Sequence, residues 1–110
     1  MTARIISLCA YRNRLTVDTS LQGLVGLYLP RQGRVHVLDH EQARELADWL
    51  RSAVEMRSFR RSRTGLVVAS DARRVVLITA ETGRVELERP EAAGVALRLA
   101  RAVSQQEVAP

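Results

Sequence analysis

Apolar and polar side chains alternate along the first forty residues with the two-residue period of a β-strand. Ile6 and Leu8 alternate with less apolar neighbours, and Asn13 lies in the short turn that follows, where asparagine tolerates the left-handed conformation. Residues 24–29 are almost continuously apolar, which is typical of a strand covered on both faces or at an interface. The pattern predicts four strands, over Arg4–Tyr11, Leu15–Asp18, Leu24–Leu29 and Val35–Leu38.

The period then changes to that of a helix. Asp39 is a favourable N-cap, and Gln42 stands three residues later as its capping-box partner. These signals predict an amphipathic helix over His40–Glu55. Its expected buried face consists of Ala43, Leu46, Ala47, Leu50, Ala53 and Val54.

The second half of the chain shows the same order of predicted elements, four strands followed by a helix. Four strands are predicted, over Ser58–Arg61, Leu66–Ala69, Val75–Thr79 and Val85–Leu87. A second helix is predicted over Pro90–Ser104, since proline is favoured at the first helical position. Residues 105–110 are expected to form a frayed tail. The expected buried face of this helix consists of Ala93, Ala96, Leu97, Ala100 and Val103.

The two halves also share residues at an interval of about fifty positions, without a gap. The matching residues are Val17, Ser20, Val25, Leu27, Gly33, Arg34, Val35, Glu41, Ala43 and Arg51, with Val67, Ser70, Val75, Leu77, Gly83, Arg84, Val85, Glu91, Ala93 and Arg101. We therefore expect an α+β fold with an internal duplication of a ββββα unit, in which two antiparallel sheets are backed by two helices. The repeat units are about 4–55 and 56–104, within a single pseudo-symmetric domain spanning 1–110.

The charge of the chain suggests a polyanionic partner. The net charge is +5, and all 17 basic residues are arginine, whose planar guanidinium suits phosphate and carboxylate groups. Codon bias in a GC-rich genome explains the absence of lysine equally well. Cys9 is the single cysteine and has no partner for an internal disulfide, and no apolar run approaches a membrane span. We therefore expect a cytoplasmic protein.

The residues that could carry chemistry do not form a catalytic or metal-binding pattern. His36, Asp39, His40 and Glu41 cluster at the first strand-to-helix junction, but their spacing points them in different directions, so capping and solvation explain them better. Cys9 lies among apolar strand residues, as a small buried hydrophobe does. We expect no enzyme activity, no metal and no cofactor.

The densest run of charge, Arg57–Arg63, has two interpretations. It is either a solvated linker between the repeat units or the first strand of the second sheet. In a strand, alternate residues share a face, so Arg57, Phe59, Arg61 and Arg63 are expected to stand in a row. Cations around an aromatic ring are the combination that binds single-stranded nucleic acid. The corresponding strand of the first half ends in Tyr11 and Arg12, and Arg4 and Arg14 are nearby. The expected nucleic-acid-binding residues are Arg4, Tyr11, Arg12, Arg14, Arg57, Phe59, Arg60, Arg61 and Arg63.

A second hypothesis is a homo-oligomeric adaptor or regulatory protein that binds another protein. Apolar strands that two helices cannot cover favour pairing with another copy, so we expect a homodimer or a higher oligomer. Trp49 is either a core-edge residue or an interface anchor. The expected protein interface consists of Leu24, Leu27, Leu29 and Trp49.

The duplicated element order over Arg4–Ser104 resembles the Whirly architecture, in which two antiparallel four-stranded sheets are backed by two helices. That group includes single-stranded DNA binders of plants and mitochondrial guide-RNA binders, and the actinobacterial SsgA-like cell-division proteins are similar to it. The resemblance implies a small, non-enzymatic protein that binds single-stranded DNA or RNA. The resemblance rests on the order of the elements. No diagnostic motif allows functional residues of that group to be assigned to positions in this sequence.

Overall fold

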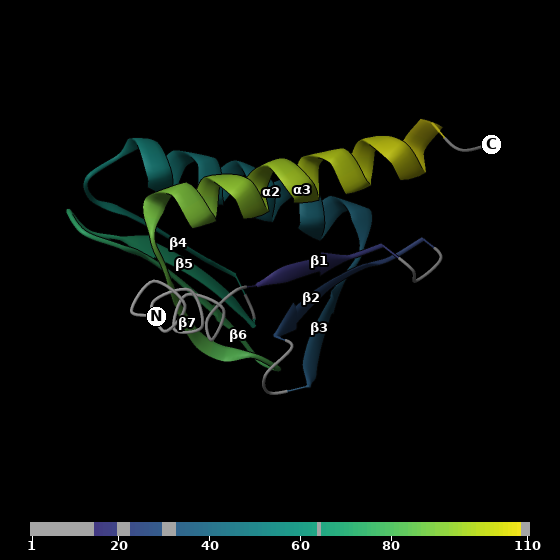
Figure 1. The fold of residues 1–110 in the computed structure, drawn as a ribbon, viewed down its shortest axis with the longest axis horizontal. Helices are drawn as coiled ribbons and strands as arrows, with labels where there is room; N and C mark the ends of the chain where they lie inside the picture. The colour runs from purple at the N-terminus through teal and green to yellow at the C-terminus, as the bar shows by residue number, and fades with distance from the viewer. Residues whose placement is uncertain (1–14, 20–22, 30–32, 64, 109–110) are drawn as a thin grey trace, which may run out of the picture.

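The computed structural model describes residues 15–19, 23–29, 33–63 and 65–108, with side chains as far as residue 105. These residues form two antiparallel sheets, of three and four strands, and two helices, which confirms the predicted α+β class (Figure 1). The predicted strand Arg4–Tyr11 lies outside the described residues. The elements are β1 (Thr16–Asp18), β2 (Val25–Leu29), β3 (Arg34–Leu38), α2 (His40–Glu55), β4 (Phe59–Arg63), β5 (Leu66–Ser70), β6 (Val75–Thr79), β7 (Gly83–Leu87) and α3 (Arg89–Val108).

The three-stranded sheet has the order β1-β2-β3 and buries one of its faces. Leu27 of β2 lies opposite Val17 on one side and His36 on the other, and residues paired in this way project to the same face. The alternate residues Val25, Leu27 and Leu29 are buried in the core. The outer face of β2 carries Gly26, which is buried, and Tyr28, which is half-buried.

The four-stranded sheet has the order β4-β5-β6-β7, with β4 and β7 at its edges. Val68, Leu77 and Val85 lie opposite one another on β5, β6 and β7 and are buried. Val67 and Ile78 are paired on the outer face, where they are half-buried. The strand β4 spans Phe59–Arg63, so the arginine run is a strand and not a linker.

The helix α2 forms as the sequence predicts. The Asp39 side chain accepts a hydrogen bond from the Gln42 backbone N–H at 2.8 Å, and the Gln42 side chain accepts one from the Asp39 N–H at 3.0 Å. This reciprocal capping box fixes the start of the helix. The predicted buried face is confirmed for Ala43, Leu46, Ala47, Leu50 and Ala53, while Val54 is half-buried.

The buried face of α3 is rotated from the predicted one, and only Ala96 and Val103 of the predicted residues are buried. Ala93, Leu97 and Ala100 are exposed, and the helix continues past Ser104 to Val108. The buried residues are Ala92, Val95, Ala96, Leu99, Ala102 and Val103.

The length of one turn explains why the buried face of α3 was predicted incorrectly. The buried residues of α3 follow those of α2 at an interval of 49, as from Leu50 to Leu99, and not at the fifty of the sequence repeat. Four residues separate the paired Leu29 and Arg34 between β2 and β3, but only three separate Thr79 and Gly83 between β6 and β7. A shift of one residue rotates a helix by about 100°, so the interval of fifty selects the wrong side of α3.

Each helix packs on the sheet from the other half of the chain. The helix α2 follows β3 and contacts it, but its larger contacts are with β5 and β4 of the second half, and it also contacts β6. The helix α3 follows β7 but contacts β1 and β2. The two helices lie side by side over both sheets (Figure 1). The buried side chains of both sheets and both helices therefore belong to one hydrophobic cluster.

Candidate nucleic-acid interface

The excess positive charge of the chain lies in one segment. Residues 57–74 contain six arginines and a single acidic residue, a net charge of +5, which equals the net charge of the whole chain. The remaining arginines and acidic residues balance. The six arginines are Arg57, Arg60, Arg61, Arg63, Arg73 and Arg74.

The fold places four of these arginines on or just before the edge strand β4, and the other two, Arg73 and Arg74, in the turn between β5 and β6. The strand β4 is an edge strand, and all its arginines are exposed. Phe59 at the start of β4 lies opposite Ser70 at the end of β5, so the turn 71–74 lies beside the start of β4. This arrangement places Arg57 at the same end of the sheet as Arg73. We call β4 together with Arg57, Arg73 and Arg74 the basic edge.

The turn of the basic edge is held by Asp71. Its carboxylate accepts hydrogen bonds from the backbone N–H groups of Arg73, at 2.7 Å, and Arg74, at 2.9 Å. The N–H of Asp71 donates to the Arg74 carbonyl at 3.0 Å. The hydrogen bonds from Arg74 and then Arg73 lower the pKa of the Asp71 carboxyl group from its ordinary value. Asp71 therefore orients the turn as a carboxylate.

The arginines of the basic edge differ in how far they are engaged. Arg63 Nη1 lies 3.2 Å from Glu45 Oε2 of α2, and Arg74 Nη1 lies 2.8 Å from Glu86 Oε2 of β7. Arg57, Arg60 and Arg73 have exposed side chains with no ion pair inside the described part of the chain. These three side chains can therefore bind an anion without breaking an existing contact.

Phe59 has a structural role on the inner face of the sheet. Its ring is partly buried and packs against the hydrophobic cluster. The guanidinium carbon of Arg61 stands 5.6 Å from the ring centroid, at cation–π distance. Phe59, Arg61 and Arg63 share a face as predicted, but Arg57 precedes the strand and is not part of this row. The shared face is the one turned toward α2. The surroundings of the ring leave little of it open to a nucleic-acid base.

The other predicted site residues divide into three groups. Arg4, Tyr11, Arg12 and Arg14 lie outside the described residues. Leu27 and Leu29, expected at a protein interface, are instead buried in the core because they project to the inner face of β2. Leu24 has 37% of its surface exposed, and Trp49 is a half-buried residue at the edge of the core.

The histidine and acidic cluster near α2 is not assembled as a metal site. Asp39 caps the helix, and the described residues hold no group of three or more histidine, cysteine, aspartate or glutamate side chains that could bind a metal. His36 points to the inner face of β3, where its Nδ1 is buried without a hydrogen-bond partner. Burial lowers the pKa of His36, and the negative charge of Glu81 acts weakly in the opposite direction.

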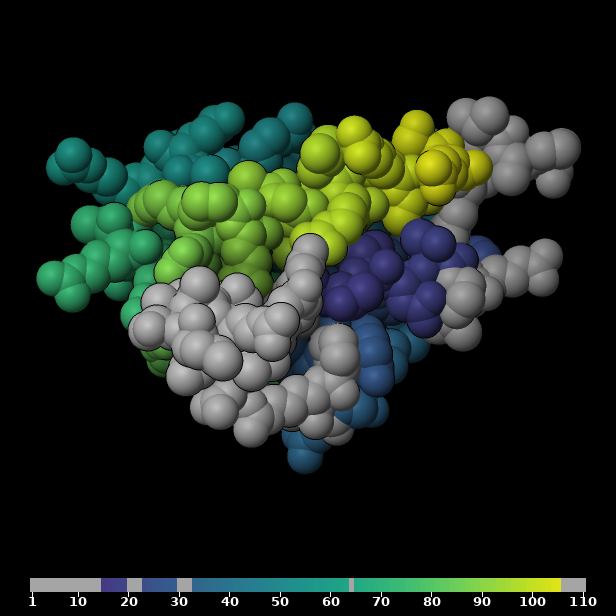
Figure 2. Space-filling model, in the orientation of Figure 1, coloured from purple at the N-terminus to yellow at the C-terminus, as the bar shows by residue number. Residues whose placement is uncertain are grey.

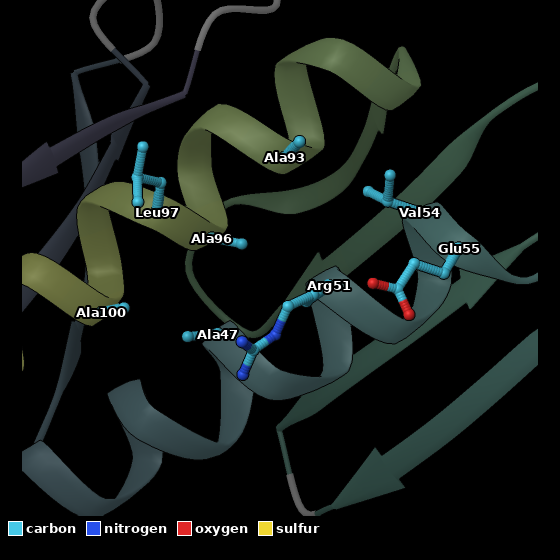
Figure 3. Close-up of a pocket in the computed structure, with 8 residues that line it drawn as sticks. All are labelled: Ala47, Arg51, Val54, Glu55, Ala93, Ala96, Leu97 and Ala100. Atoms are coloured by element: carbon cyan, nitrogen blue, oxygen red, sulfur yellow. The ribbon is translucent and has the colours of Figure 1, made fainter.

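Two apolar surfaces were not recognised in the sequence. Val35 and Val37 are exposed on the outer face of β3, and Leu24, the residue before β2 that was expected at a protein interface, is exposed as well. A groove of about 370 Å³ also runs between α2 and α3 (Figure 3). Its lining residues are Ala47, Arg51, Val54, Glu55, Ala93, Ala96, Leu97 and Ala100. The signal for this groove was present in the sequence, since α3 is apolar on more than one face.

No helix among the described residues is long and apolar enough to cross a lipid bilayer. Neither a protein-family model nor a curated protein nor a solved structure shows significant similarity to the chain.

Proposed function

We propose that this chain is a small, non-enzymatic protein that binds single-stranded nucleic acid through the basic edge. The observation that carries this proposal is the concentration of the whole net charge of +5 in residues 57–74. Alternate residues of a strand stand about 7 Å apart, as Arg61 and Arg63 do on one face of β4, and Arg60 projects from the other face. Exposed arginines along an edge strand suit a flexible chain of phosphates that runs along the edge. Cys9, as the only cysteine, is compatible with a reducing compartment such as the cytoplasm.

Three arginines are the primary phosphate contacts in this proposal. Arg57, Arg60 and Arg73 form no ion pair within the described residues, so no ion pair has to be broken there. The Asp71 carboxylate near Arg73 is engaged by backbone N–H groups of the turn. To bind a phosphate, Arg63 must break its ion pair with Glu45, and Arg74 must break its ion pair with Glu86. These surface ion pairs contribute little, so the exchange costs little.

A single strand fits this surface better than a duplex. Reading a duplex through its major groove requires an exposed helix or a two-stranded ribbon with basic residues. The helix α2 carries four acidic residues and two arginines, so it repels the phosphates of a groove. The ribbon β4-β5 is part of a four-stranded sheet and does not project from the protein.

Phosphate contacts, rather than base stacking, supply most of the affinity. Stacking requires an open aromatic face. Phe59 is covered by the core and by Arg61, whereas the arginines are exposed. Binding is therefore sequence-independent and strongly dependent on salt.

The internal duplication of a ββββα unit is also part of the proposal. It is supported by the matching buried residues of the two helices, such as Leu50 and Leu99, and by the antiparallel order shared by β1-β2-β3 and β5-β6-β7. A duplicated fold of this kind resembles the Whirly group, which agrees with single-stranded nucleic acid as the ligand.

An alternative explanation for the arginines is protection of the sheet edge. Charged side chains on an edge strand prevent it from pairing with the same strand of another molecule. This explanation requires no ligand. It predicts that replacing the arginines leads to aggregation without loss of any binding activity.

The test is the binding of a fluorescein-labelled oligo-dT at increasing salt, followed by fluorescence anisotropy. The edge variant carries Arg57→Ala, Arg60→Ala and Arg73→Ala, and the control variant carries Arg34→Ala, Arg44→Ala and Arg101→Ala with the same change in charge. We expect the edge variant to bind weakly and to lower the slope of log K against log salt by about 2, since each single-strand phosphate contact contributes about 0.7. The control variant should bind nearly as the natural chain does.

Two outcomes contradict the proposal. If the natural chain does not bind oligo-dT at low salt, the basic edge protects the sheet and binds no nucleic acid. If the control variant loses as much affinity as the edge variant, overall charge governs binding and the edge is not the site.

A further inference from the structure

The helix α3 is apolar around most of its circumference. Its residues from 92 to 103 include only two polar side chains, Arg98 and Arg101. The inner row packs in the core, but the outer row, Ala93, Leu97 and Ala100, is exposed. Leu97 has 52% of its surface exposed. A helix that is apolar on all sides is typical of a buried helix, and no other described residue covers the outer row of α3.

The groove between the two helices continues this exposed row. Figure 3 shows Ala93, Ala96 and Ala100 along the α3 side, and Arg51 and Glu55 along the α2 side. The small alanine side chains leave a space of about 370 Å³, and Leu97 borders it as the largest exposed apolar side chain of the helix pair.

The α2 side of the groove carries one charge of each sign. Arg51 and Glu55 are one helical turn apart. Arg51 Nη2 lies 2.7 Å from Asp48 Oδ1, on the side away from Glu55 in sequence, and more than half of each side chain in that pair is exposed. Glu55 forms no ion pair inside the described ranges of the chain. The groove therefore presents an apolar floor and a rim with one free acidic group.

We propose that the groove is the interface between two copies of this chain, docked helix layer against helix layer about a two-fold axis. Leu97 of each copy enters the groove of the other, and Arg51 faces the partner's Glu55. A two-fold axis brings the same patch of each copy together, so a patch that carries both signs one turn apart is complementary to itself. This charge complementarity selects a second copy as the occupant.

This interface is separate from the basic edge. The helices lie on one side of both sheets, whereas the basic edge belongs to β4 and the turn 71–74 (Figure 1). Docking through the helices leaves the two basic edges of the dimer exposed. The proposal for the dimer therefore stands or fails independently of nucleic-acid binding.

The first test measures the dimer dissociation constant by sedimentation equilibrium over a range of protein concentrations. The natural chain should dimerise at micromolar concentrations, and Leu97→Glu should raise the dissociation constant by at least about tenfold, because a charge would be buried in the groove. Leu97→Gln serves as a milder variant, and circular dichroism confirms that each variant is folded. A natural chain that remains monomeric throughout overturns the proposal.

The second test exchanges the charges at positions 51 and 55. Only an interface in which Arg51 faces the partner's Glu55 allows the double variant to recover the dimer. Arg51→Glu alone and Glu55→Arg alone place like charges against each other across the axis, and each should weaken the dimer. The double variant restores opposite charges and should return the dissociation constant to within about threefold of the natural value. Arg73→Glu, with the same charge change on the distant turn, should leave the dimer intact.

Two results of the second test overturn the proposal. One is a double variant that dimerises no better than the single variants. The other is a dimer that resists Leu97→Glu but is broken by Val37→Glu, which would place the interface on the outer face of the three-stranded sheet.

Discussion

The guanidinium of Arg89 donates a hydrogen bond to the carbonyl oxygen of Ala53, 2.8 Å away, and so joins the first turn of α3 to the last turn of α2. The same Nη1 lies 2.7 Å from the carbonyl oxygen of Val54, and Nη2 donates to the carbonyl oxygen of Asp71. The helix α2 has no basic residue in its own last turn. Arg89 therefore supplies the cation that favourably meets the negative end of the helix and its unpaired carbonyl groups.

Replacement of Arg89 by alanine should lower the free energy of unfolding by about 2–3 kcal/mol, because several hydrogen bonds to a charged donor are lost at a partly buried position. Arg89→Lys should recover only part of this loss, since an ammonium group cannot reproduce the planar fork. Urea unfolding followed by circular dichroism measures both variants. Arg101→Ala, an exposed position on the same helix, is the control. Equal stabilities of Arg89→Ala and Arg101→Ala would show that the contacts to α2 are not stabilising.

The buried face of α3 can be tested with two leucines that stand two residues apart. Leu99 is fully buried and Leu97 is 52% exposed. Leu99→Ala should therefore lower the free energy of unfolding by about 2–5 kcal/mol, whereas Leu97→Ala should lower it by less than about 1 kcal/mol. Urea unfolding at protein concentrations below the dimer dissociation constant measures both. A larger loss of stability in Leu97→Ala than in Leu99→Ala would support the buried face of α3 that the interval of fifty residues predicted.

The role of Phe59 can be separated from nucleic-acid binding by a leucine. Phe59→Leu keeps an apolar side chain against the core but removes the aromatic ring. We expect the affinity for oligo-dT to change by less than about threefold, because exposed arginines supply the binding. Fluorescence anisotropy at two salt concentrations measures the change. A loss of about tenfold or more, equal at both salts, would instead indicate base stacking on the ring.

His36 should make the stability of the protein depend on pH. Burial lowers the pKa of His36 below its ordinary value of 6.5, so the folded state favours the neutral imidazole. Its stabilising contribution is complete above the ordinary pKa and is lost as the pH falls through the lowered pKa of the folded state. The melting temperature of the natural chain should fall as the pH decreases below about 6.5, beyond any change in His36→Gln.

Glu81 provides the matched variant for this pH dependence. Its negative charge partly opposes the effect of burial on His36. Glu81→Gln should therefore lower the pKa of His36 further and steepen the loss of stability toward acidic pH. If Glu81→Gln and the natural chain have the same pH profile, the two groups are not coupled.

The elements of this fold whose signals are local could be predicted from the sequence. The helix α2 has its capping box and its apolar stripe in the local sequence, so its bounds are confirmed, and so is its buried face except for Val54. Strands such as β6 are bounded by turn residues and were predicted at the correct positions. The arginine-rich strand β4 was predicted as one of two alternatives.

Features that depend on distant parts of the chain could not be predicted. Both Leu97 and Leu99 lie on apolar rows of α3, and the length of the turn between β6 and β7 decides which row is buried. Alternation along β4 placed Phe59 and Arg61 on one face, but it could not reveal that α2 packs on that face. The bond from Arg89 to Ala53 joins residues 36 positions apart and has no signal in the local sequence.

The exchange of helices between the two halves has a consequence for biosynthesis. The helix α2 packs on β4, β5 and β6, all of which emerge from the ribosome after it. The strands β1 and β2 are covered by α3, which is the last element to be synthesised. Apolar surface of the first half therefore remains exposed until nearly the whole polypeptide has been translated. A nascent chain stalled after Met56 contains the three-stranded sheet but lacks β4, β5 and β6, against which α2 packs in the complete fold, so such intermediates should be preferred clients of chaperones.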